Sequence, residues 1–174
     1  MIWFTVALLW AWMAWGFLWN RYATINWAAP YFAWLFAIEV LLLLWVGAIR
    51  GRLRARRSRD AASMLGLAFF VLTLAFYPLL APLAGRPWQE AEIFGVAPDP
   101  TALCTLGLLL LVEGRPRWEL MAIPILWCSI SGATLWAMDS PGALIPPLAA
   151  LLVLGVSARL QVKRAEFESP PALL

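Results

Sequence analysis

Residues 31–60 read YFAWLFAIEVLLLLWVGAIRGRLRARRSRD, and this stretch decides the fold class. Its first part, residues 31–49, is apolar except for Glu39. At about 1.5 Å per residue, a helix of this length crosses a hydrocarbon core of roughly 30 Å. Its second part, residues 50–60, contains six arginines. A long apolar run that ends in a cluster of positive charge is typical of a membrane-spanning helix that stops at the cytoplasmic surface.

The composition of the whole chain supports the same interpretation. Of 174 residues, 63% are hydrophobic and 13% are charged, whereas soluble domains have roughly 45–50% and about 25%. The mean hydropathy is +0.79 and the isoelectric point is near 9.3. Because the positive charge is concentrated in one short loop, we interpret the net charge of +3 as a topology signal and expect no nucleic-acid partner.

The apolar runs predict an all-α fold, a polytopic transmembrane helical bundle over residues 1–158, followed by a polar cytoplasmic tail over residues 159–174. About six spans are expected, near residues 2–19, 31–49, 61–84, 93–112, 118–138 and 142–158. Pro78 and Pro82 should kink or fray the end of the third span. The first span has no small-residue cleavage site after it, so we expect it to be retained in the membrane.

The fourth span is the weakest of the six. Its continuous apolar run, residues 101–112, would form only about 18 Å of helix, which is too short to cross unless residues 93–98 also enter the membrane. The distribution of basic residues nevertheless requires this crossing. With six spans, 11 of the 13 Lys and Arg residues fall on one side and two on the other, which predicts that both termini are cytoplasmic.

The residue types exclude several kinds of chemistry. The chain has no histidine, so it has no imidazole for haem, chlorophyll or zinc and no Ser-His or Cys-His pair. Its single lysine, Lys163, lies in the tail. Cys104 and Cys128 fall inside apolar runs, which supports neither a disulfide framework nor a metal cluster. We therefore expect no catalytic, cofactor-binding or metal-binding residue and no enzyme activity, with membrane lipids as partners.

Glu39 is the first candidate functional residue, because a carboxylate in the middle of a span is expensive and normally faces a partner or water. The alternative is a protonated or hydrogen-bonded Glu39 that only ties helices together. Asp99 is the second candidate. It precedes Pro100 and Thr101 as the N-cap of a short helix, an arrangement similar to the broken helices of transporters, although simple capping explains it as well.

Three further groups of residues are candidates for contacts. Asn20, Arg21 and Asn26 could bind a polar ligand or another subunit, although anchoring at the membrane interface explains them too. Small residues at i, i+4 and i+8 predict close helix packing; they are Ser129, Ala133 and Ala137. Arginines of the basic loop could bind anionic lipid, although their role in topology is sufficient to explain them; they are Arg52, Arg54, Arg56 and Arg57.

Three stretches resemble a family of small bacterial multi-pass membrane proteins of unknown function. They are residues 21–32 (RYATINWAAPYF), the segments GRPW at 85–88 and APDPT at 97–101, and residues 126–138 (LWCSISGATLWAM). The resemblance covers most of the chain. It implies a protein of the bacterial cytoplasmic (inner) membrane and transfers no activity.

Two functions of different classes remain open. The first, which we favour at this stage, is a non-catalytic subunit or scaffold that packs against other membrane protein subunits, for example in an energy-transducing, photosynthetic or respiratory complex. Small-residue helix faces and twelve tryptophans favour it. The second is a small-solute or proton-linked transporter or permeation protein that uses Glu39.

Overall fold

The computed structural model is a bundle of helices and describes residues 1–56 and 60–168. Two of the long helices continue as π-helical stretches, and the third is followed by a 3-10 turn and a short helix. The elements are α1 Ile2–Trp12, η1 Met13–Trp19, η2 Tyr22–Thr24, α2 Ala29–Leu42, η3 Leu43–Ile49, α3 Ala61–Phe76, η4 Tyr77–Leu79, α4 Leu80–Leu83, η5 Trp88–Glu90, α5 Pro98–Leu110, α6 Trp118–Ala137 and α7 Ile145–Glu168.

Five helices in the described part of the chain are long and apolar enough to cross a membrane. They cover Ile2–Thr24, Ala29–Ile49, Ala61–Leu83, Trp118–Ala137 and Ile145–Lys163. The predicted all-α bundle is therefore confirmed, and the length and composition of these five helices are compatible with a multi-pass membrane protein. The predicted disruption of the end of the third span is also present, because α3 ends at Phe76 and a 3-10 turn that contains Pro78 follows, whereas Pro82 lies inside the short helix α4.

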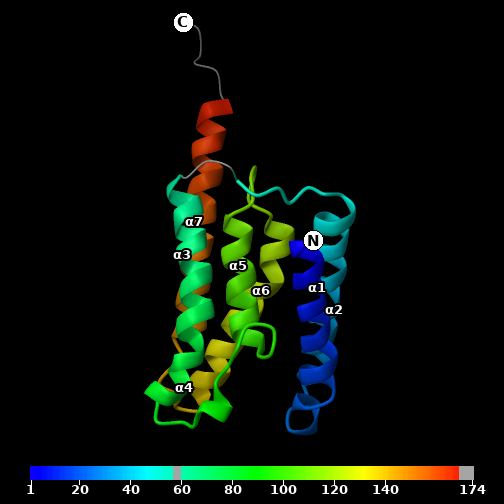
Figure 1. Ribbon diagram of the computed structural model, residues 1–174, viewed down its shortest axis with the longest axis vertical. Coiled ribbons are helices and arrows are strands. Elements are labelled where there is room, and N and C mark those ends of the chain that lie inside the picture. The colour runs from blue at the N-terminus through cyan, green and yellow to red at the C-terminus, as the bar shows by residue number, and fades with distance from the viewer. Residues whose placement is uncertain (57–59, 169–174) are drawn as a thin grey trace, which may run out of the picture.

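The helices run alternately up and down, so the loops gather at two ends (Figure 1). We call the end that holds residues 50–56 and 113–117 the basic end. Trp3 donates from Nε1 to the Leu53 carbonyl at 3.0 Å, which places the start of α1 there, and Trp118 donates to Gln161 at 2.5 Å, which places α7 there. The opposite end holds residues 20–28, 84–97 and 138–144.

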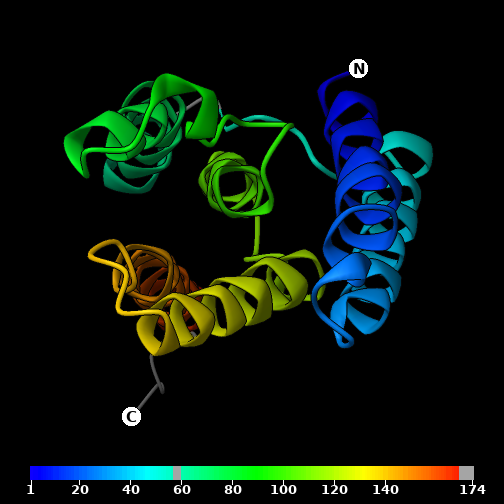
Figure 2. The ribbon, with the colours of Figure 1, turned by 90° about the horizontal axis from the view of Figure 1, so that it is seen from below.

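Helix α5 is the centre of the bundle (Figure 2). It is only 13 residues long, and every residue except Leu108 is buried. It contacts α3, α6, α7 and α1, while the paired α1 and α2 form one side of the molecule. The predicted fourth span is thus a short helix enclosed by longer ones. It is too short to count among the five helices that could cross a membrane.

Glycines allow α3 and α5 to approach closely. A Cβ at Gly66 would lie 2.8 Å from Leu110 Cβ and 3.0 Å from the Gly107 carbonyl oxygen. A Cβ at Gly107 would in turn lie 3.2 Å from the Gly66 carbonyl oxygen. Two facing glycines therefore bring the backbones of these helices together, as small residues commonly do between membrane helices.

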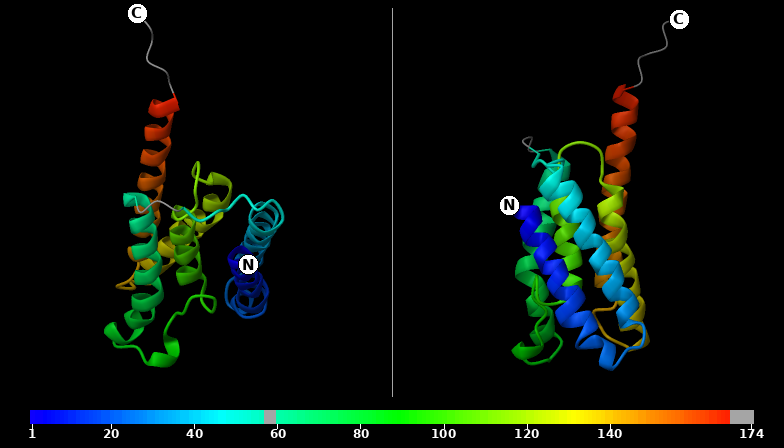
Figure 3. Two further views of the ribbon diagram at one scale, coloured as in Figure 1. Left: turned by 45° about the horizontal axis from the view of Figure 1, so that its top comes forward. Right: turned by 90° about the vertical axis from the view of Figure 1, so that its right-hand side faces the viewer.

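Two boundaries differ from those predicted. Helix α5 begins at Pro98 with Ala97 as its N-cap, so Asp99 is not the N-cap and lies in the first turn. Helix α7 continues through residues 159–168, where we predicted that the polar tail begins, and it extends beyond the other helices at the basic end (Figure 3). The remainder of the predicted tail, residues 169–174, lies outside the described residues.

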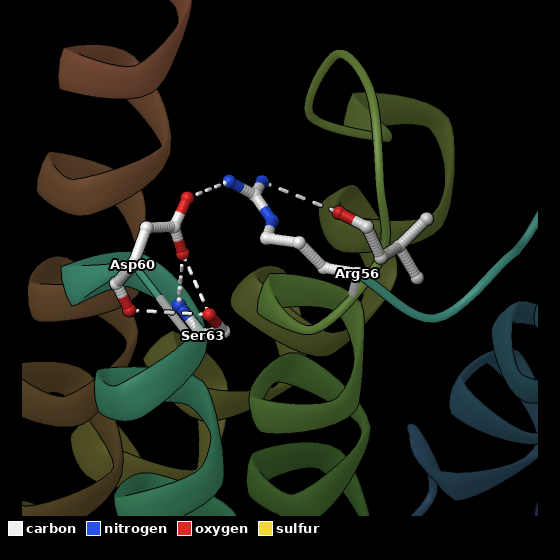
Figure 4. A network of polar contacts seen from close by, with 4 residues as sticks. Arg56, Asp60 and Ser63 are labelled. Carbon is white, nitrogen blue, oxygen red and sulfur yellow. Dashed lines mark hydrogen bonds and ion pairs between the residues drawn. The ribbon is translucent and has the colours of Figure 1, made fainter. Parts of the chain in front are cut away.

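Helix α3 begins at a side-chain cap (Figure 4). Asp60 Oδ1 accepts hydrogen bonds from the backbone N–H of Ser63 at 2.9 Å and from its hydroxyl at 2.6 Å. Oδ2 pairs with Arg56 Nη1 at 2.5 Å. Partial burial alone would raise the pKa of Asp60, but the hydrogen bonds from Ser63 and the charge of Arg56 outweigh it and lower the pKa to about 2. The start of α3 therefore holds a firmly ionised carboxylate.

Replacing Gly66 by Ala should destabilise the protein, because the new methyl group would force α3 away from α5. We expect a loss of about 1–3 kcal/mol, as is usual for overpacking, measured as a lower thermal unfolding midpoint in mild detergent. The matched control is Gly155→Ala in α7, where no atom lies within 4 Å of the added Cβ. An unchanged midpoint for Gly66→Ala would show that the two helices do not pack this closely.

Candidate functional site

Asp99 is the centre of a buried polar cluster at the start of α5. Its Oδ1 accepts a hydrogen bond from Trp127 Nε1 at 2.7 Å. Its Oδ2 accepts from the Ser131 hydroxyl at 2.6 Å and from the Tyr77 hydroxyl at 3.2 Å. Asp99 is 6% exposed. One carboxyl group thus connects α5 to α6 and to the turn that follows α3.

The local sequence explains why a helix can start at this buried place. Gly95 has a φ of +80°, which a residue with a side chain rarely adopts, and turns the chain toward the helix. Its N–H donates to Thr101 Oγ1 at 2.9 Å, and the same hydroxyl donates to the Ala97 carbonyl at 2.6 Å. Pro98 and Pro100 have no N–H to satisfy. The first turn of α5 therefore leaves few backbone donors without a partner.

Two cavities meet beside this cluster at the opposite end. One, of about 360 Å³, is lined by residues that include Tyr77, Arg86 and Glu92. The other, of about 250 Å³, is lined by Glu92, Asp99 and Ser131 together with aromatic side chains. Glu92 borders both cavities. A chain of polar groups thus leads from the loop at the opposite end to the buried Asp99.

The charge of Glu92 is sensitive to this environment. Its side chain is half-buried. Burial, helped by the nearby charge of Asp99 and opposed by Arg86, raises the pKa of Glu92 from the ordinary 4.5 to about 7. Glu92 can therefore gain or release a proton near neutral pH at the mouth of the site.

An aromatic cluster lies beyond Asp99 in the bundle. Trp127, which donates to Asp99, packs edge to face on Phe36 with ring centroids 5.0 Å apart. Phe36 packs on Trp10 with centroids 4.4 Å apart, and Trp10 donates from Nε1 to Thr105 Oγ1 at 2.9 Å. Phe36 and Trp10 are 1% and 0% exposed, so these rings form a dry layer.

Glu39 lies one helical turn after Phe36 on α2. Its side chain is 0% exposed, and neither carboxylate oxygen has a hydrogen-bond partner. It belongs to the buried stripe of the helix that also contains Ala33, Phe36 and Leu43. The alternative in which Glu39 ties helices together by a hydrogen bond is therefore wrong for this arrangement. Glu39 is a buried acid without a partner.

A family model with the description "Family of unknown function (DUF6064)" matches residues 1–166. The chain belongs to this family. The resemblance to a family of unknown function is thereby confirmed. The comparison with curated proteins found no match, and the comparison with solved structures found none either.

The predicted interface residues of this DUF6064 chain make local contacts. Asn20 is exposed and donates from Nδ2 to the Trp15 carbonyl at 2.7 Å. Asn26 accepts at Oδ1 from the Ala28 N–H at 2.9 Å, and the side chain of Arg21 is exposed. All three lie in the turn between the first two spans. The structure does not bring them together with Asp99 or Glu39 into one site.

The predicted packing stripe faces outward. Ser129, Ala133 and Ala137 are all exposed on α6, so they make no close packing within the bundle, and their packing against another helix stays a prediction. The close contact with α7 is made instead by Gly132, where a Cβ would lie 2.7 Å from the ring of Pro147. The exposed stripe remains free to contact lipid or another protein.

The four predicted lipid-binding arginines have different environments. Arg52 and Arg54 are exposed at the basic end. Arg56 is engaged by Asp60 and also donates to the Val112 carbonyl at 3.3 Å. Arg57 lies outside the described residues. Arg56 is therefore not an exposed group like Arg52 and Arg54. It instead joins the start of α3 to the end of α5.

The sequence analysis missed the partners of Asp99. Tyr77, Glu92, Trp127 and Ser131 were not among the candidate residues. No local pattern could identify Tyr77 or Trp127, which are 22 and 28 positions away from Asp99. A signal was available for Glu92, which is one of few acidic residues in a loop next to a helix that starts inside an apolar segment.

Metal ligands are sparse in the described residues. Within residues 1–56 and 60–168, no three His, Cys, Asp or Glu side chains lie close enough to hold a metal ion. Cys104 and Cys128 are buried and not disulfide-bonded. The groups that the site offers are therefore proton donors and acceptors, namely the carboxyls of Glu92 and Asp99 and the hydroxyls of Tyr77 and Ser131.

The raised pKa of Glu92 predicts a pH-dependent stability. A carboxyl whose pKa is higher in the folded protein stabilises the fold below its unfolded pKa of 4.5, and this stabilisation is lost as the pH rises through about 7. As the pH rises from 5 to about 8, we expect Glu92→Gln to lose less stability than the wild type. The measurement is the thermal unfolding midpoint against pH, with the exposed Glu90→Gln as control. Parallel curves for wild type and Glu92→Gln would contradict this prediction.

Proposed function

We propose that this chain is a non-enzymatic membrane protein that moves protons or a small cation across the bilayer, with Glu39 as the group that the proton or cation reaches inside the bundle. The observation that carries the proposal is the complete burial of Glu39 without a hydrogen-bond partner for either oxygen. Intramembrane carboxyls of this kind normally belong to ion pathways or proton relays. Glu39 lies about 15 Å along the helix from Ala29, deep within its span.

A second carboxyl site strengthens this interpretation. Proton-linked transport needs more than one ionisable group inside the membrane region, and the sequence by itself offered only Glu39 as a clear case. Asp99 is buried at the start of α5, and Glu92 borders the two cavities that lead to it. Two carboxyls and several hydroxyls outnumber the single basic side chain, Arg86, in the lining of these cavities, which suits a proton or a cation better than an anion.

The two sites are separated by the dry aromatic layer. Trp127 links the two sites. Its indole N–H donates to Asp99, and its ring packs on Phe36, which lies one turn from Glu39. In this arrangement the buried rings of Trp127 and Phe36 lie on the way from Asp99 to Glu39. A closed state of a pathway has this property, since transport proteins expose an internal site to one side at a time.

The alternative function, a non-catalytic subunit or scaffold, is favoured by the outer surface. The stripe of Ser129, Ala133 and Ala137 faces outward, where it would allow a helix of another protein to approach closely. Large aromatic side chains of α1 and α2 also face outward; Trp15 and Trp34 are each 65% exposed. A partner could be a subunit of a larger membrane complex, whereas the transport proposal needs no partner.

Proton flux into liposomes distinguishes the two functions. With the purified protein reconstituted and a pH-sensitive dye enclosed, we expect a flux that Glu39→Gln lowers by about tenfold or more, because the isosteric amide cannot release a proton. Asp99→Asn should have a similar effect, since the amide keeps a hydrogen-bonding group but loses the charge. The control is Glu90→Gln, which changes an exposed acid outside the buried cluster.

Unchanged flux in Glu39→Gln, with the variant still folded and monodisperse, would refute the role of Glu39. A wild-type protein that carries no flux and co-purifies stably with other membrane proteins in mild detergent would favour the subunit function instead. Equal unfolding midpoints of Glu39→Gln and wild type exclude misfolding as the cause of lost flux.

We further propose that the protein lies in the bacterial cytoplasmic membrane, with both termini and the basic end in the cytoplasm. The supporting observation is that residues 50–56, residues 113–117 and the end of α7 gather at one end of the bundle, because such positive residues are retained on the cytoplasmic side.

Labelling of introduced cysteines tests this arrangement in cells. In a variant without Cys104 and Cys128, a membrane-impermeant maleimide should react with cysteine at Glu90 in intact cells. Cysteine at Glu113 should react only after the membrane is opened, because α5 together with the chain before it separates these two exposed positions. Reaction of both positions in intact cells, or of Glu113 alone, would overturn the proposed topology.

A further inference from the structure

The basic end carries a second polar feature, which the transport proposal does not use. Residues 50–56 form an extended segment, here called the arginine strap, that runs from the end of α2 across the end of α5 (Figure 3). Its backbone pairs with the chain after α5. The Arg56 N–H donates to the Leu111 carbonyl at 2.8 Å, and the Glu113 N–H donates to the Arg54 carbonyl at 2.8 Å.

Further contacts hold the arginine strap in place at its middle. Leu53 is buried, and its carbonyl accepts the indole N–H of Trp3. The Arg52 carbonyl accepts from Arg117 Nη2 at 3.2 Å. Gly51 has a φ of +58°, a conformation that favours glycine, and it turns the chain between Arg50 and Arg52. The strap is therefore a built element and not a loose loop.

The arginine strap borders a shallow, open hollow of about 470 Å³ beside the start of α6. The residues that line this hollow are Arg50, Gly51, Arg52, Arg54, Glu113 and Arg117. Four guanidinium groups and one carboxylate give the hollow a net charge of +3. Arg56 is absent from the lining because Asp60 and the Val112 carbonyl engage it (Figure 4). The positive charge of this hollow thus comes from three arginines of the basic loop and from Arg117, which the sequence did not group with them.

The position of the hollow suits the surface of a bilayer. It lies where the span Ala29–Ile49 ends. Arg50 lies over the ring of Trp45, 4.6 Å from its centroid, an arrangement that keeps a cation and an aromatic ring together at the membrane interface. Guanidinium groups bind phosphate through paired N–H donors and stay charged at every physiological pH.

We propose that this hollow is a binding site for a phosphate group, with Arg52 and Arg54 as the principal ligands and Arg50 and Arg117 beside them. The phosphate can belong to the headgroup of an anionic lipid or to a soluble phosphorylated molecule, because the same donors recognise both. A topogenic role alone requires only that arginines lie on one side of the membrane. It does not require four arginines to line one hollow, nor the backbone of the strap to be held by hydrogen bonds to the chain after α5.

The test compares two double variants of the full chain in dodecyl maltoside. Arg52→Gln/Arg54→Gln removes two charges from the hollow, and the control Arg159→Gln/Lys163→Gln removes two exposed charges from α7 at the same end. Thermal unfolding is followed while phosphatidylglycerol, phosphatidylcholine, glycerol 3-phosphate or inorganic phosphate is added. All of the substituted side chains are exposed, so the fold should persist.

We expect phosphatidylglycerol, but not phosphatidylcholine, to raise the unfolding midpoint of the wild type. The half-saturating concentration should rise by about fivefold for each arginine removed from the hollow, and should be nearly unchanged in the α7 control. Saturation by glycerol 3-phosphate or inorganic phosphate, lost in the hollow variant, would assign the site to a soluble ligand. An equal loss in both double variants would show that general surface charge causes the effect and would overturn the proposal. The absence of stabilisation by phosphatidylglycerol, glycerol 3-phosphate and inorganic phosphate alike would also overturn it.

Discussion

A helix that begins inside an apolar bundle has backbone N–H groups that water cannot reach, and an unsatisfied group in hydrocarbon is expensive. Helix α5 meets this constraint at its N-terminus. Two of its first three residues are prolines, which have no N–H, and the residue between them is Asp99. The carboxylate of Asp99 suits the positive end of the helix dipole, and it accepts hydrogen bonds from Trp127, Ser131 and Tyr77. The same carboxyl therefore solves the problem of starting the helix and creates a buried polar site.

The aromatic layer follows from the choice of Trp127 as a partner of Asp99. An indole has one polar edge and a large apolar face. Its N–H is used by Asp99, so its ring is directed into the bundle, where it meets Phe36. The rings of Trp127 and Phe36 thus connect the Asp99 carboxyl to the turn of α2 that carries Glu39. A serine or asparagine at this position could satisfy Asp99 but would leave space and polarity where the bundle now excludes water.

The sequence was sufficient to predict the elements that depend on hydropathy and on single residues. The apolar run at 31–49 corresponds closely to the helical span Ala29–Ile49, and Pro78 marks the end of α3. It could not show which face of a helix is buried when both faces are apolar. Ala133 was therefore assigned to packing although it is exposed, while the neighbouring Gly132 makes the contact. Glu39 was recognised by its depth alone, whereas its lack of a partner depends on side chains from several helices.

Helix α5 is held at both ends, and this limits how a pathway to Glu39 could open. Arg56 joins its C-terminal end to α3, Gly66 and Gly107 bring these two helices into contact, and Asp99 fixes the N-terminal end. Sliding α5 would break all of these contacts together. The contact with α1 is different, because it includes the hydrogen bond from Trp10 to Thr105, and the ring of Trp10 in turn packs on Phe36 of α2. Rotation of these side chains disrupts far fewer interactions, so the aromatic layer is the element whose movement would most readily connect Asp99 with Glu39.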